Sequence, residues 1–298
     1  MSNFNQFSAL LGLVALGAMT SCSKHEDASD CSKQRVCVEL NQFKFLSNPL
    51  TKADAATGTV SQIAFKAFDA AGAEVYATTQ SAGDTDFGTL NFELAPGAYT
   101  FVAVGNRLSS NAPQGAMVSI SSVGQATLPE SLPTDVFSLT EEVTIEPRTP
   151  FTTSMTLPRV MAQFKLVMTD ILPANVATFE VTANPDVAAT GAFASFNPAD
   201  GSLLTERRWT KSANVSASAG KQSISFTLNM LLGSDQEEAD ITVNAYDAAG
   251  SLITTLTLQD VPMKRNRITT ATGALFNAES SQTLTFLTDW SAPYELTF

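Results

Sequence analysis

Apolar and polar residues alternate in short runs along most of the chain, which is the pattern of half-buried β-strands. Clear examples lie at residues 162–168, 224–230 and 294–298. The run at residues 99–104 is mostly apolar, as expected for a central strand that is buried on both faces. Helical periodicity is confined to short pieces near residues 128–136 and 274–278. The pattern therefore predicts an all-β protein.

One hairpin pattern occurs twice. Residues 63–75 and residues 241–253 each contain an alternating strand, the turn sequence Asp-Ala-Ala-Gly and a second strand. The Asp side chain can bond to the backbone of the turn, and Gly accepts the left-handed conformation that reverses the chain. The repeat favours a duplicated domain, although any β-hairpin could carry such a turn.

The strands fit two β-sandwiches in tandem. Two prolines interrupt the alternation within residues 145–150, and the link between the sandwiches is expected there. The predicted organisation is a signal peptide (1–21), a polar leash (22–35), an N-terminal sandwich (36–148) and a C-terminal sandwich (149–298).

The N-terminus has the pattern of a bacterial lipoprotein signal. An apolar run at residues 9–18 is too short to span a bilayer, and it leads to small residues before Ser21 and Cys22. Cleavage between these two residues would leave Cys22 as the lipid-carrying first residue, and acyl chains such as palmitate would then anchor the protein. No Lys or Arg precedes the run, and the alternative is a soluble protein with an apolar N-terminal segment.

Composition limits the partners. The formal net charge of −12 makes nucleic acid and anionic lipid headgroups poor partners, so membrane contact is expected through the lipid alone. A hydrophobic content of 44% is enough to build folded cores. In an oxidising compartment Cys31 and Cys37 could form a disulfide, and the alternative is two free thiols.

The residues for catalysis are missing. The single histidine, His25, lies in the predicted leash, which excludes triads and multi-histidine metal sites from the folded part. The acidic residues at 235–240 could bind calcium, but an exposed acidic turn is the simpler interpretation. Trp209 and Trp290 could stack on a sugar, but isolated tryptophans are more often packing residues. We expect no enzyme, no metal, no cofactor and no small-molecule substrate.

Several short motifs, in order along the chain, resemble the FimB-like fimbrial anchor lipoproteins of the fimbrillin superfamily of Bacteroidetes. Cys22 with the acidic stretch at 26–31 is similar to the start of those proteins, and it also resembles the tag of surface-exposed lipoproteins. The hairpin turn at 68–72, the stretch at 94–106 and the Lys-Arg-Asn stretch within 261–273 are similar to later landmarks.

The resemblance implies two transthyretin-like (Greek-key) sandwiches and assembly with other fimbrial subunits by strand complementation. Stalk subunits of this kind are trimmed after an Arg near the N-terminus, whereas an anchor stays lipidated; Arg35 lies near that place. Both chain ends offer strands for exchange. The residues concerned are Val36, Val38, Leu40, Tyr294, Leu296 and Phe298.

The expected function is therefore that of a fimbrial anchor or accessory subunit that supports adhesion. It would be exposed on the cell outer membrane and attached to it by lipid. The alternative is a surface lipoprotein that binds glycans through Trp209 or Trp290.

Overall fold

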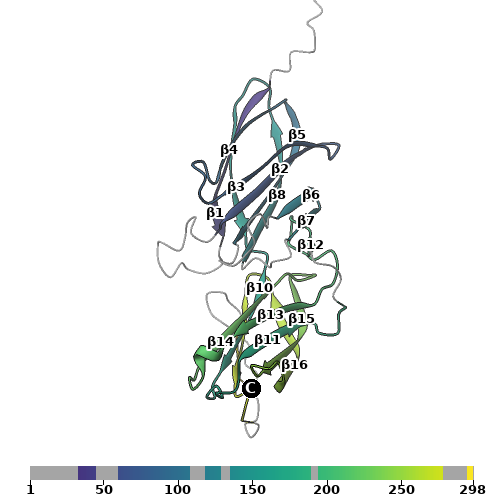
Figure 1. The fold of residues 1–298 in the computed structure, drawn as a ribbon. Coiled ribbons are helices and arrows are strands. Elements are labelled where there is room, and N and C mark those ends of the chain that lie inside the picture. The colour runs from purple at the N-terminus through teal and green to yellow at the C-terminus, as the bar shows by residue number, and fades with distance from the viewer. Residues whose placement is uncertain are drawn as a thin grey trace, which may run out of the picture. The chain divides into compact units, whose positions relative to one another are not determined.

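The computed structural model describes residues 33–44, 60–107, 118–128, 135–188, 194–277 and 294–297 (Figure 1). The chain divides into two units, Met1–Cys31 and Ser32–Phe298, and every described residue belongs to the second unit. Ser21, Cys22, His25, Cys31, Trp290 and Phe298 lie outside the described residues. Within the described ranges, no helix is long and apolar enough to cross a membrane.

The prediction of an all-β protein is confirmed. The only helical element in the described ranges is the 3₁₀ turn η1 (Ser216–Ser218). The strands are β1 (Gln34–Lys44), β2 (Gln62–Asp69), β3 (Glu74–Ser81), β4 (Thr89–Leu94), β5 (Gly97–Arg107), β6 (Ser119–Ser122), β7 (Gln125–Thr127), β8 (Asp135–Ile145), β9 (Phe151–Pro158), β10 (Ala162–Met168), β11 (Thr178–Ala183), β12 (Ser195–Phe196), β13 (Trp209–Asn214), β14 (Ser225–Met230), β15 (Gln236–Tyr246), β16 (Leu252–Lys264), β17 (Ile268–Gly273) and β18 (Tyr294–Thr297).

The first sandwich consists of the sheets β4-β1-β9 and β3-β2-β5-β8. Alternate residues of both sheets point into one shared core, as the period-two pattern requires. Phe65 and Phe101 of the second sheet meet edge-on there, with ring centroids 5.3 Å apart. Val38 of β1 packs into the same core and is fully buried.

The second sandwich consists of the sheets β14-β10-β17-β18 and β13-β11-β15-β16. β10 shows the predicted alternation over its whole length, with Phe164 and Leu166 fully buried and Gln163 and Lys165 half-buried. Together the two sandwiches confirm the expected architecture.

The two sandwiches share one strand topology. β1 pairs antiparallel with β4 and parallel with β9, and β10 pairs antiparallel with β14 and parallel with β17. In the facing sheets the order β3-β2-β5-β8 corresponds to β13-β11-β15-β16. β18 is an addition to the second sandwich without a counterpart among the described strands of the first.

The repeated hairpin does not reflect this duplication. Residues 63–75 form β2 and β3, whereas residues 241–253 lie in β15 and β16, and the topology makes β2 equivalent to β11. What the copies share is the turn. Asp69 accepts bonds from the backbone of Ala71 and Ala73, and Asp247 accepts the same pair of bonds from its own turn. The same type of turn thus occurs at two places in the chain, and the repeat does not mark equivalent positions in the two sandwiches.

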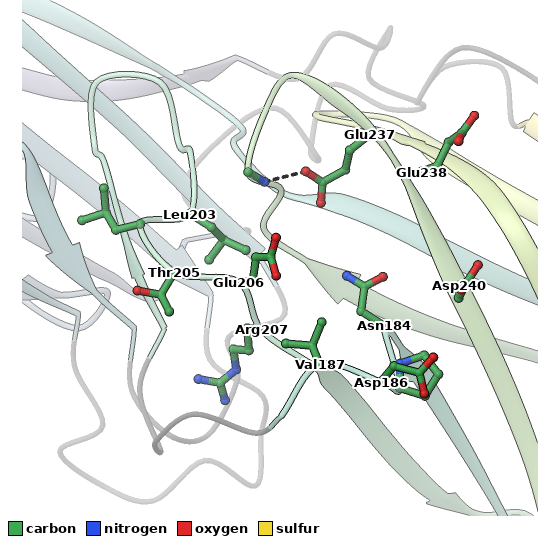
Figure 2. A pocket seen from close by; sticks show the side chains of 13 residues that line it. Asn184, Asp186, Val187, Leu203, Thr205, Glu206, Arg207, Glu237, Glu238 and Asp240 are labelled. Atoms are coloured by element: carbon green, nitrogen blue, oxygen red, sulfur yellow. Dashed lines mark hydrogen bonds between the residues drawn. The ribbon is translucent and has the colours of Figure 1, made fainter.

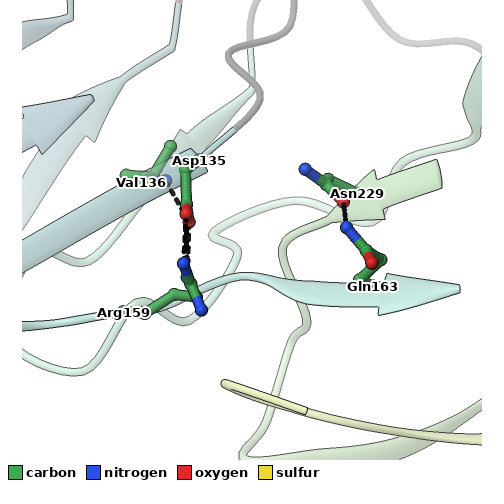
Figure 3. Close-up of polar contacts among 5 residues, drawn as sticks. All are labelled: Asp135, Val136, Arg159, Gln163 and Asn229. Carbon is green, nitrogen blue, oxygen red and sulfur yellow. Dashed lines mark hydrogen bonds and ion pairs between the residues drawn. The ribbon is translucent and has the colours of Figure 1, made fainter. Parts of the chain in front are cut away.

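A small sheet and a short linker connect the sandwiches. In the sheet β12-β7-β6, β6 and β7 lie between β5 and β8 of the first sandwich in sequence, and β12 comes from the second half of the chain. The linker between β9 and β10 is buried: Arg159 forms a two-pronged ion pair with Asp135 at the start of β8 (Figure 3). Val160 packs against Gly201, where a Cβ atom would lie 2.3 Å from the Val160 Cβ. Since β9 pairs with β1, we propose that the division between the domains falls within residues 159–161.

The short helices expected near 128–136 and 274–278 are not present in the described residues of those stretches. Asp135 and Val136 begin β8. After β17 the chain bends, because the Asp170 carboxylate accepts hydrogen bonds from the backbone N–H groups of Leu275 (2.9 Å) and Phe276 (2.6 Å). A side chain distant in sequence thus determines this local conformation.

Candidate assembly site

β1 is the central strand of its sheet. Its inward residues Val36, Val38 and Leu40 are 1%, 0% and 0% exposed, so the predicted one-sided strand is confirmed. Its backbone is paired on both sides, with β4 and with β9. The strand nearest the predicted lipid attachment site is therefore an integral part of the first core.

Arg35 lies inside β1, on its exposed face, in register with Glu93 of β4. Cys37 is half-buried and lies in register with Asn91 of β4 and Thr152 of β9. A cut after Arg35 would leave residues 36–44 within the sheet. Cleavage at this position therefore opens no groove in the sheet unless the remainder of β1 also dissociates.

Aromatic rings close the edge of this sandwich beside β1. The ring of Tyr76 on β3 stacks on that of Phe92 on β4, with centroids 4.0 Å apart and planes at 7°. Phe92 also lines a hollow of about 360 Å³ at the start of β1, together with Arg35 and Phe151. The Tyr76–Phe92 stack joins β3 and β4, the edge strands of the two sheets.

The C-terminal strand β18 runs parallel to β17, from the pair Thr269–Tyr294 to the pair Thr272–Thr297. It occupies the outer edge of its sheet and is joined to that sheet through β17 alone. In the first sandwich β9 has the position of β17, and no described strand pairs with its outer edge. The predicted exchange residues thus differ in setting: those of β1 are central and those of β18 are at an edge.

An acidic pocket of about 510 Å³ lies between the ends of strands in the second sandwich (Figure 2). Glu206, Glu237, Glu238 and Asp240 line it together with Arg207, so it contains part of the acidic stretch considered for calcium. The Glu237 carboxylate already accepts a bond from the Gly233 backbone at 2.8 Å. Among the described residues no group of three or more His, Cys, Asp or Glu side chains has the arrangement of a metal site.

Trp209 is buried, with 1% of its surface exposed, and the Arg207 guanidinium carbon lies 5.2 Å from its ring centroid. It packs in the core of the second sandwich. The interpretation of Trp209 as a packing residue is therefore confirmed, and the alternative of a sugar-binding platform at this residue is excluded because its ring is buried. Trp290 lies outside the described residues.

Residues 67–297 match DUF6562, which is described as a family of unknown function. The chain belongs to this family. The match begins within β2, so the leader and β1 precede it.

No curated protein gives a significant match. Among solved structures the chain is similar to a candidate adhesin from Bacteroides ovatus, with 15% identity, 75% of this chain and 76% of that chain covered, and a TM-score of 0.46. It is also similar to the fimbrial anchor protein Mfa2 from Porphyromonas gingivalis (14% identity, 76% and 83% covered, TM-score 0.43). A third is a fimbrial assembly protein from Parabacteroides distasonis (9% identity, 84% and 93% covered, TM-score 0.40).

Proposed function

We propose that this protein is a surface lipoprotein that acts as an anchor or accessory subunit of a fimbria and supports adhesion. Its partners would be other fimbrial subunits, joined to it by strand pairing, and the outer membrane, reached through acyl chains on Cys22. The names of the fimbrial structures to which the chain is similar agree with the family that its own sequence motifs resemble.

The observation that carries the proposal is the position of β1. Burial of Val36, Val38 and Leu40 at the centre of a paired sheet ties the folded body to the predicted leash that begins at Cys22. An anchor requires this connection, because a pulling force on the filament is transmitted to the lipid through the polypeptide chain. A stalk subunit that exposes a groove by trimming would require the opposite, a removable first strand.

The edge position of β18 supports the proposed pairing with other fimbrial subunits. A strand held to its sheet by one neighbour loses fewer backbone hydrogen bonds on leaving than a central strand does. β18 is therefore the better candidate for pairing with another subunit, whereas β1 is the better candidate for retention.

Negative-stain microscopy of cells and culture medium tests the proposal in a strain that lacks the gene. Filaments released into the medium, or abnormally long filaments, are expected. A strain complemented with Cys22→Ser provides the matched control, because it restores the folded chain without the predicted lipid and should still release filaments. Filaments that are unchanged in both strains, or that vanish on deletion, contradict an anchor.

A further inference from the structure

On the outer surface of the sheet β13-β11-β15-β16, the strands β13, β11 and β15 carry polar side chains in cross-strand rows. We name this surface the polar face; its residues are Thr210, Thr182 and Thr242 in one row, Ser212, Glu180 and Asn244 in the next, and Asn214, Thr178 and Tyr246 in the third. The residues between them along the strands, such as Phe179, Val181 and Val243, point the other way into the core.

The fold does not require this surface to be polar. On the topologically equivalent sheet of the first sandwich, β2 and β5 place Phe68, Val102 and Val104 on the corresponding outer surface. Those residues are buried in one cluster with Ile120 of β6 and Ala126 of β7, so that surface is covered. On the second sandwich the same surface has hydroxyl, amide and carboxylate groups, and no described strand covers it.

Hydrogen bonds within the polar face hold its side chains in place. The Thr182 and Thr210 hydroxyl oxygens are 3.1 Å apart. The Glu180 carboxylate accepts bonds from the hydroxyls of Tyr246 and Ser212, each at 3.4 Å. Each hydroxyl has one donor and two acceptor positions, and a carboxylate accepts about four bonds, so capacity for a ligand remains.

The polar face is hollowed at both ends. One hollow of about 460 Å³ is lined by Glu180, Thr182 and Asn244 together with Arg208. The other, of about 400 Å³, is lined by Thr178, Asn214 and Tyr246 and by the turn after β15. The rows of Thr182 and Thr178 are four residues apart along β11, which is roughly 13 Å at the rise of a strand. The surface can therefore contact several units of a chain-like ligand.

The charges and hydrogen-bonding groups of the polar face indicate which class of ligand it can bind. Glu180 in the middle row is negatively charged and Arg208 at one end is positively charged, so the surface has no net charge of one sign and suits a ligand without net charge. A polyanion would meet Glu180 and the overall charge of −12. An apolar partner would leave the hydroxyl and amide groups unpaired, at a cost in free energy.

We propose that the polar face binds a neutral glycan. Sugar hydroxyls both donate and accept, as the threonine and amide groups here do, and neighbouring sugar hydroxyls can donate to the Glu180 carboxylate. The half-buried ring of Tyr246 offers the apolar surface on which the C–H face of a sugar packs. This site is independent of the fimbrial role and of the tryptophans.

Affinity electrophoresis of the purified mature protein tests this proposal, with dextran, yeast mannan and laminarin as the neutral polymers in the gel. The wild type should be retarded by at least one of them. Thr182→Val/Thr242→Val and Glu180→Ala should each weaken that binding by about tenfold or more, since each removes hydrogen bonds to the ligand. Thr79→Val on the exposed part of β3 is the matched control and should bind like the wild type.

The melting temperature of each variant, measured alongside, confirms that it remains folded. The double threonine variant keeps the charge and the side-chain shape, so it decides the result if Glu180→Ala is unstable. Equal binding by the folded double variant and the wild type overturns the proposal, and so does a lack of retardation by all three polymers. Neither result bears on the anchor, because filaments are measured separately.

Discussion

The ion pair at the linker between the sandwiches yields the sharpest prediction about stability. The Arg159 Nε atom lies 2.7 and 2.9 Å from the two Asp135 carboxylate oxygens, and its Nη2 atom lies 2.5 Å from one of them (Figure 3). The side chains are only 5% and 9% exposed. Burial raises the pKa of Asp135, and attraction by Arg159 offsets only part of that effect.

Removal of one partner would leave the other charge buried. We expect Asp135→Ala to lower the free energy of unfolding by about 3–5 kcal/mol. Replacement of both groups, as Asp135→Leu/Arg159→Met, should be neutral or should stabilise the protein by about 1–4 kcal/mol, because the desolvation of two charges is avoided. The Met side chain also preserves the packing of the Arg stem, whose guanidinium carbon lies 5.3 Å from the Phe137 ring centroid.

Urea unfolding followed by tryptophan fluorescence measures these differences. The matched control is Glu74→Ala, which breaks the exposed ion pair of Glu74 with Lys66 and should cost less than about 1 kcal/mol. The reasoning is refuted if Asp135→Ala is no more destabilising than Glu74→Ala. It is also refuted if the double variant is as unstable as the single one.

Three further predictions follow from the same structure. Burial raises the pKa of Asp135 above its ordinary value, so its contribution to stability is lost as the pH rises through the folded-state pKa. Urea titrations should therefore show the wild type gaining stability relative to the Asp135→Leu/Arg159→Met variant as the pH falls through that pKa, and a flat difference would contradict this. Gly201→Ala, at a φ of +74° and against Val160, should cost about 2–4 kcal/mol in thermal unfolding, and Val160→Ala should recover part of that loss; full stability of Gly201→Ala would show that the contact is relaxed. Limited trypsin digestion of the folded protein should cut after Lys33 before it cuts after Arg35, since Arg35 is paired within β1, and early fragments that start at Val36 would argue against a stable first strand.

The sequence was sufficient for predicting strands whose burial is local. In β10 the alternation of apolar residues with Gln163 and Lys165 predicts which side chains face the core, and the structure follows it. In β5 the apolar residues from Phe101 to Val104 predict burial on both faces, which the small sheet and the sandwich core provide.

Features that depend on distant partners were not accessible in the same way. The parallel pairing of β1 with β9 joins strands more than a hundred residues apart, and no local pattern encodes that choice. The bend at residues 274–277 depends on Asp170, so short-range periodicity there was misleading. The hairpin repeat was misleading for the opposite reason, because a turn with strong local hydrogen bonds can recur at unrelated positions.

The candidate sites divide along the same line. The sequence placed Val36, Val38 and Leu40 on one face of a strand, but it could not show that this strand is central. The Asp135–Arg159 pair and the polar face were not predicted at all. In the sequence, Asp135 and Arg159 are isolated charges and the residues of the polar face are ordinary exposed positions of strands. Only the fold brings each set together.

The mass of the intact protein, purified from the outer-membrane fraction of cells, tests the central claim most directly. If the protein is an anchor, the mass equals that of residues 22–298 plus acyl chains, and fragmentation places those chains on Cys22. A chain that begins at Val36 and has no lipid would contradict the claim, because the folded protein would then have no covalent connection to Cys22 and its acyl chains.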